Sequence, residues 1–155
     1  MKRNVIRRMV VNLSFAVVVA VLLPAAHGES CSLARAAAPY AFSDSGTVVG
    51  VGPRVAVGTI TFDAAGNVSG KATSSLNGNI STETFSGTYT VNPDCTGTFN
   101  VDIIDQSGNK IFTVTSNLAW DNNMREFRAI FTSLVLPNGG SLATVISGDA
   151  RKLVP

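Results

Sequence analysis

One continuous run, from Gly87 to Ile103, reads as a strand, a tight turn and a second strand. The turn is Asn92-Pro93-Asp94, where proline presets φ and the flanking side chains bond the local backbone. On either side of it, bulky or small apolar residues alternate with polar ones: Phe85, Gly87, Tyr89 and Val91 before the turn, and Gly97, Phe99, Val101 and Ile103 after it. A period of two is typical of half-buried antiparallel strands. This run therefore predicts a hairpin with one buried face.

The rest of the chain repeats this rhythm. Eight strand-like segments follow one another, at about 40–50, 54–63, 68–76, 80–91, 95–105, 109–121, 125–135 and 141–152. Only short, turn-rich gaps separate them, so no crossover helix fits and parallel βαβ units are excluded. Before the first strand, the alanine-rich segment 31–39 predicts one or two helical turns. The predicted fold is all-β, an eight-stranded antiparallel up-and-down meander barrel, with a two-sheet β-sandwich as the alternative.

The alternation also predicts which side chains face inward. Six phenylalanines share a face with other apolar or small residues: Phe62, Phe85, Phe99, Phe112, Phe127 and Phe131. The opposite faces are rich in Thr, Ser and Asn, which suit an exposed strand surface. We therefore expect an aromatic and aliphatic interior. Glu83 and Glu126 are expected among the polar, outward-facing positions, and nothing in their spacing supports a glycosidase pair.

The N-terminus has the pattern of a Sec-type signal peptide. A basic start is followed by an apolar run from Met9 to Leu23, and then by Pro24 and small residues. The predicted organisation is a signal peptide over 1–28, cleaved after Gly28 or after Ala26, and a single barrel domain over 29–155. An uncleaved anchor is the alternative. This organisation predicts a secreted or periplasmic protein with no membrane span in the mature chain.

Removing residues 1–28 leaves eight Lys and Arg against ten Asp and Glu, so the formal charge becomes 8 − 10 = −2. No basic cluster remains, which argues against nucleic-acid binding. The single histidine is His27, so Ser-His-Asp and Cys-His catalytic sites are excluded from the mature domain, and neither a metal site nor a cofactor is expected. Cys31 and Cys95 predict one disulfide in an exported protein; two buried thiols are the alternative.

Three segments carry a resemblance: Gly58–Gly70, Asn77-Gly78, and Gly87–Thr98 with its Asp-Cys-Thr-Gly turn. They resemble a group of exported bacterial proteins of unknown function, and the architecture is similar to lipocalin-like and allene-oxide-cyclase-like barrels. The resemblance implies a barrel and carries over no catalytic residue. The lipocalin Gly-x-Trp on the first strand is absent, since the lone tryptophan, Trp120, stands near the end of the sixth predicted strand.

Candidate ligand contacts are Trp120, Tyr89 and Ser116. Trp120 and Tyr89 combine an apolar ring with one polar group, and Ser116 interrupts an apolar face. Each has a purely structural alternative, as a core side chain or as a hydroxyl bonded to the backbone. The same holds for Tyr40 and Thr144.

Three functions fit these observations. The first is an exported barrel that binds a small apolar ligand. The second is a structural or protein-interaction module of the cell envelope with a solid core. The third is a cofactor-free isomerase of the allene-oxide-cyclase type, which acts mainly by shaping its substrate.

Overall fold

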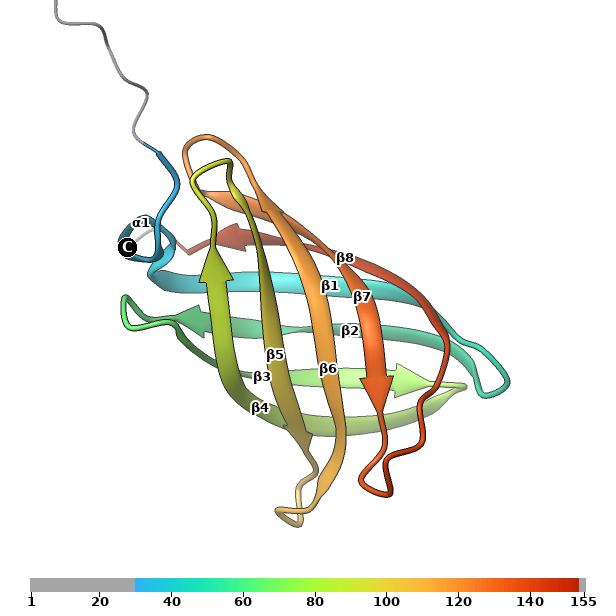
Figure 1. The fold of residues 1–155 in the computed structure, drawn as a ribbon. Helices are drawn as coiled ribbons and strands as arrows, with labels where there is room; N and C mark the ends of the chain where they lie inside the picture. The colour runs from blue at the N-terminus through green and yellow to red at the C-terminus, as the bar shows by residue number, and fades with distance from the viewer. Residues whose placement is uncertain (1–29, 154–155) are drawn as a thin grey trace, which may run out of the picture.

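The computed structural model describes residues 30–153 and shows a closed antiparallel barrel in which each strand pairs with the next and β8 closes onto β1 (Figure 1). The elements in chain order are α1 (Leu33–Ala36), β1 (Ala38–Val48), β2 (Gly52–Phe62), β3 (Asn67–Leu76), β4 (Asn79–Val91), β5 (Thr96–Ile104), β6 (Lys110–Trp120), β7 (Glu126–Val135) and β8 (Thr144–Lys152). The predicted meander barrel with its short helical turn is confirmed, and the sandwich is not adopted. The predicted signal peptide lies outside the described residues.

The strand twist that closes the barrel depends on inward-facing glycines. A Cβ at Gly87 would lie 2.0 Å from the carbonyl oxygen of Asn100 on β5, so only glycine allows the two backbones to approach this closely. Gly70 faces Phe85 across the β3–β4 ladder, and the Phe85 ring occupies the space that a Cβ of Gly70 would need. These positions let the strands coil without losing the buried face.

One end of the barrel is closed by a plug, which we define as residues 31–37. Cys31 and Cys95 form a disulfide with a Cα–Cα distance of 5.0 Å, which confirms the predicted bond. Ser32 begins α1 and accepts a hydrogen bond from the Arg35 backbone N–H. Figure 1 shows α1 lying at the end of the barrel where β1 begins. The disulfide therefore ties the plug to the β4–β5 turn.

The aromatic core lies directly beneath the plug. The Phe62 ring contacts those of Tyr40, Tyr89, Trp120 and Phe127, with centroids 4.5 to 6.1 Å apart. Edge-to-face and tilted ring pairs of this kind add to the stabilisation from burial alone. Most of the predicted inward phenylalanines are buried, while Phe112 and Phe131 are only partly covered.

No helix within residues 30–153 is long and apolar enough to cross a membrane.

The hydrogen-bonded ladder between β7 and β8 is shorter than the strands themselves. It starts at Glu126↔Arg151 and ends at Ile130↔Ser147. Beyond that point β7 pairs with the returning loop through Val135↔Ser141. The last part of β7 is thus separated from the first part of β8.

Candidate functional site

The interior of the barrel holds a small cavity of about 60 Å³. Its wall is mainly aromatic and aliphatic, formed by Phe42, Phe85, Phe99, Phe127 and Phe131 together with Ile60, Val101, Ile103 and Val114. Ala129, Gly148 and Asp149 line it on the β7–β8 side, next to the point where the ladder between these strands ends. The cavity is therefore a largely apolar chamber that lies near the end of the β7–β8 ladder.

Charged side chains line the same cavity, on the side formed by β1, β2 and β4. Asp44, Arg54 and Glu83 are only 9%, 5% and 3% exposed. The prediction that Glu83 faces outward is wrong: it points into the barrel with Phe85, two residues further along β4. The reason is a partner on another strand, the Arg54 guanidinium, which the local polarity of the sequence does not reveal. Glu126 does lie on the outside, where it pairs with Arg151.

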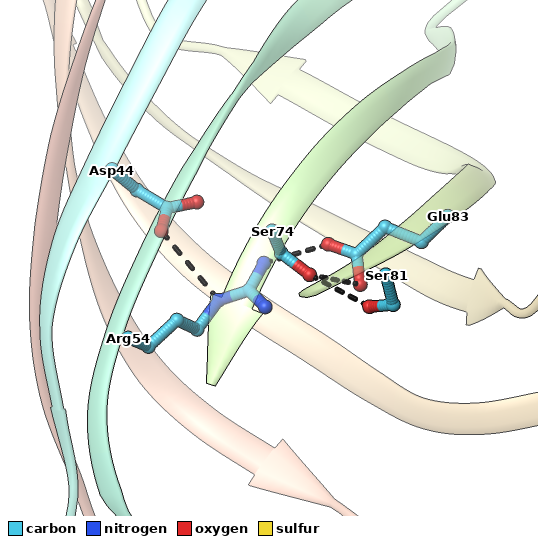
Figure 2. Close-up of polar contacts among 5 residues, drawn as sticks. All are labelled: Asp44, Arg54, Ser74, Ser81 and Glu83. Carbon is cyan, nitrogen blue, oxygen red and sulfur yellow. Dashed lines mark hydrogen bonds and ion pairs between the residues drawn. The ribbon is translucent and has the colours of Figure 1, made fainter. Parts of the chain in front are cut away.

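We call Asp44, Arg54, Ser74 and Glu83 the charged cluster (Figure 2). Arg54 Nη2 donates to Glu83 Oε1 at 2.7 Å, and Ser74 Oγ donates to Glu83 Oε2 at 3.3 Å. The Ser81 hydroxyl adds a contact of 3.1 Å to Ser74 Oγ. Because β1 to β4 are neighbours in the barrel, alternate inward positions on these strands bring the side chains together.

Asp44 is the least satisfied member of the charged cluster. Its Oδ1 lies 3.5 Å from Arg54 Nε, an ion pair in which neither buried atom makes a hydrogen bond. Burial raises the pKa of the Asp44 carboxyl to about 6, an effect that Arg54 opposes and Glu83 reinforces. Asp44 therefore combines a buried acceptor, spare hydrogen-bonding capacity and a position on the cavity wall.

The three predicted ligand contacts lie elsewhere in the interior. Trp120 packs against Phe62 and Phe127 beneath the plug. The Tyr89 hydroxyl donates toward the carbonyl oxygens of Asp63 at 2.5 Å and Leu33 at 3.2 Å, and burial raises the Tyr89 pKa to about 12. Neither side chain lines the cavity. Their role as ligand contacts stays a prediction.

Ser116 is fully buried, and its Oγ has no hydrogen-bond partner. It stands in register between Phe99 and Phe131, two residues of the cavity wall, at the point where a bulge shifts the β6–β7 pairing. Ser116 is not itself among the lining residues. Of the other two candidates, Tyr40 donates to the carbonyls of Ala36 and Met124 at the plug, and Thr144 starts β8.

Sequence reasoning missed all three charged residues of the cavity. A usable signal was present, since Asp44 and Glu83 share the alternation parity of Phe42 and Phe85, their inward-facing neighbours. Arg54 likewise shares the parity of Ile60. Burying an unpaired charge costs much free energy, so a charged residue at an inward position of a strand indicates a partner on another strand.

No protein-family model and no curated protein matches this sequence. Among solved structures, EF1p2_mFAP2b bound to DFHBI is similar with a TM-score of 0.55 and 11% identity, covering 81% of this chain and 98% of its own. A redesigned β-barrel is similar with a TM-score of 0.49 and 16% identity, and the match covers 79% of this chain and 96% of the redesigned barrel. The S-type phycobiliprotein lyase of Guillardia theta has a TM-score of 0.46 and 8% identity, and the match covers 79% of this chain and 91% of the lyase. These likenesses concern the fold alone.

Proposed function

We propose that this protein is an exported binding barrel that holds a small molecule in its interior cavity. The observation that supports this function most strongly is the charged cluster on the wall of an otherwise apolar chamber. Desolvating three ionisable groups costs free energy, and well-packed apolar residues in their place are often as stabilising or more so. A purely structural barrel gains little from such a cluster, whereas a binding site uses fixed polar groups to orient its ligand.

The volume of the cavity limits the size of the ligand. About 60 Å³ is far below the roughly 300–1,000 Å³ of sites for drug-sized molecules. The proposal is therefore a ligand of a few heavy atoms, rather than the larger apolar ligand of a wide lipocalin-like chamber. The same volume gives no support to an isomerase that encloses a long-chain substrate. We propose that the ligand enters near the point where the β7–β8 ladder ends.

Export is part of this proposal. The Cys31–Cys95 disulfide is compatible with an extracellular or periplasmic location, where thiols oxidise. The predicted signal peptide agrees with it. Mass-spectrometric sequencing of the exported protein should find Glu29 as the first residue.

The experiment uses three probes with three-carbon chains and similar size: n-propanol, propionate and propylammonium. NMR titration should show saturable shifts of cavity residues for at least one probe. Ala129→Leu places three more carbon atoms at the cavity wall and should abolish these shifts while the barrel stays folded. A matched exterior variant, Ala41→Leu on the exposed face of β1, should leave binding unchanged. If no probe binds the original protein, or if Ala129→Leu has no effect, the proposed function is wrong.

A second function, an interaction module, is favoured by a different observation. Val55, Val57, Ile130 and Val145 are large apolar side chains that are more than half exposed. The strands that carry them, β2, β7 and β8, lie together with β1 on one side of the barrel. Lysine at Val57 and Val145 should reduce association with other envelope components if this surface binds them. Unchanged pull-downs would remove this alternative.

A further inference from the structure

The charges around the cavity do not balance. Two carboxylates, Asp44 and Glu83, face one guanidinium, Arg54, inside the barrel. With these groups ionised, the lining carries an excess of negative charge. Such a lining favours a cationic ligand and repels an anionic one.

The hydrogen bonds of the charged cluster show which carboxylate carries the excess negative charge. Glu83 is satisfied by Arg54 through one oxygen and by Ser74 through the other. Asp44 makes no hydrogen bond, and its Oδ1 is 3.5 Å from the nearest guanidinium nitrogen. Arg54 therefore pairs mainly with Glu83. The carboxylate of Asp44, buried and facing the cavity, is the group that lacks a donor.

We propose that the ligand is a short-chain primary amine in its ammonium form, with its nitrogen against Asp44 and its carbon chain against the phenylalanine wall. This inference rests on the proposed function and adds the chemical class of the ligand. An ammonium group supplies three donors and one positive charge, which matches the deficit at Asp44.

Other small ligands fit this site less well. A carboxylate ligand would add a further negative charge beside Asp44 and Glu83, the two carboxylates that already pair with Arg54. A metal ion would lie next to the Arg54 guanidinium. Within residues 30–153 no group of three or more His, Cys, Asp or Glu side chains is placed to hold a metal. A neutral alcohol would donate one hydrogen bond without neutralising the charge.

The test compares propylammonium with n-propanol and propionate by NMR titration at pH 7.5. Propylammonium should bind at least 10-fold more tightly than n-propanol, because it adds a charge-assisted hydrogen bond, and propionate should bind most weakly. Asp44→Asn keeps the shape but removes the charge and should remove this 10-fold preference. The matched control is Glu126→Gln, which removes a carboxylate from the exterior ion pair with Arg151 and should leave the preference intact.

A measurement on the unaltered protein keeps the test valid if Asp44→Asn fails to fold. The charged groups facing Asp44 are Arg54 on β2 and Glu83 on β4. On β8 the position paired with Asp44 is Gly148, and the neighbouring Asp149 is exposed at an outward-facing position. Bound ammonium should lower the pKa of the Asp44 carboxyl, followed by its ¹³C shift, and propylammonium affinity should fall at pH values below about 6. An Asp44 pKa that is unaffected by propylammonium would overturn the inference.

The outcomes separate the two proposals. If n-propanol or propionate binds the cavity as tightly as propylammonium, the ammonium inference is wrong and the binding function stands. If the preference for propylammonium persists in Asp44→Asn, Asp44 is not its recognition group and the inference also fails. If none of the three probes binds, both proposals are overturned.

Discussion

The two ends of the barrel interior differ in how their buried polar groups are satisfied. Beneath the plug, aromatic rings pack edge to face, and the buried hydroxyls of Tyr40 and Tyr89 donate to backbone carbonyls. Toward the opposite end, the charged cluster buries three ionisable groups, and Asp44 makes no hydrogen bond. Packing of the first kind stabilises a fold, whereas burial of the second kind opposes it. The difference indicates that the plugged end provides stability, which the charged cluster then reduces.

Phe62→Ala should be the most damaging single change to the plugged end. Phe62 is buried and touches four other aromatic rings, so its removal should lower the free energy of unfolding by about 5 kcal/mol, the upper part of the range for buried aromatics. Phe131→Ala, at the partly exposed cavity wall, should cost about half as much. Denaturant melts would measure both. Equal losses would contradict the division between the two ends.

Removing the disulfide should have the next largest effect. The bond joins residues 64 apart in sequence, so replacing both Cys31 and Cys95 with serine should cost about 4 kcal/mol in the chain-entropy model. Amide exchange should become faster in the plug, while β5 and β6 stay protected. A uniform loss of protection across all strands would show that the bond holds the barrel rather than the plug.

Removing one member of the charged cluster should destabilise the protein, whereas replacing the whole cluster with apolar residues should not. Arg54→Met leaves two buried carboxylates without a counter-charge and should destabilise the protein by about 3 kcal/mol. Replacing the cluster as a whole, with Asp44→Leu, Arg54→Met and Glu83→Leu, should restore or exceed the original stability. Thermal unfolding of both variants provides the measurement. A triple variant less stable than the original protein would mean that the cluster stabilises the fold.

The pH dependence of the free energy of unfolding should reveal the raised pKa of Asp44. Its pKa is about 6 in the folded barrel and 3.8 in the unfolded chain, so the folded state binds the proton more tightly. This contribution to stability is present below pH 4 and is lost as the pH rises through 6. Relative to Asp44→Asn, the free energy of unfolding should therefore fall by about 2–3 kcal/mol between pH 4 and pH 6.5.

Other carboxyl groups act in the opposite direction. Hydrogen bonds within their turns lower the pKa values of Asp63 and Asp105, so their stabilising contributions are lost as the pH falls. The original protein and the Asp44→Asn variant both contain Asp63 and Asp105, so the difference between their free energies of unfolding isolates the contribution of Asp44. Parallel pH profiles for the two proteins would show that Asp44 is not perturbed by burial.

Strand positions and the barrel itself were predictable because their causes are local. Alternation with a period of two assigned the buried faces of β4 and β5, and turns such as Asn92-Pro93-Asp94 fixed where strands end. Predicted and observed strand boundaries differ by three residues or fewer. The two cysteines likewise allowed only one intramolecular pairing, and the structure contains it.

The candidate site depends on contacts that no local pattern contains. Asp44, Arg54 and Glu83 look like ordinary polar residues of exposed strands until closure of the barrel turns their side chains toward one another. Whether a carboxylate at an inward position is tolerated depends on a partner 10 to 29 residues away, because burial is affordable only for a charge that is paired. The sequence by itself determined the strands, the turns and the disulfide. Only the tertiary structure decided that the barrel interior is charged on one side and nearly filled elsewhere, and that the β7–β8 ladder ends at Ile130↔Ser147.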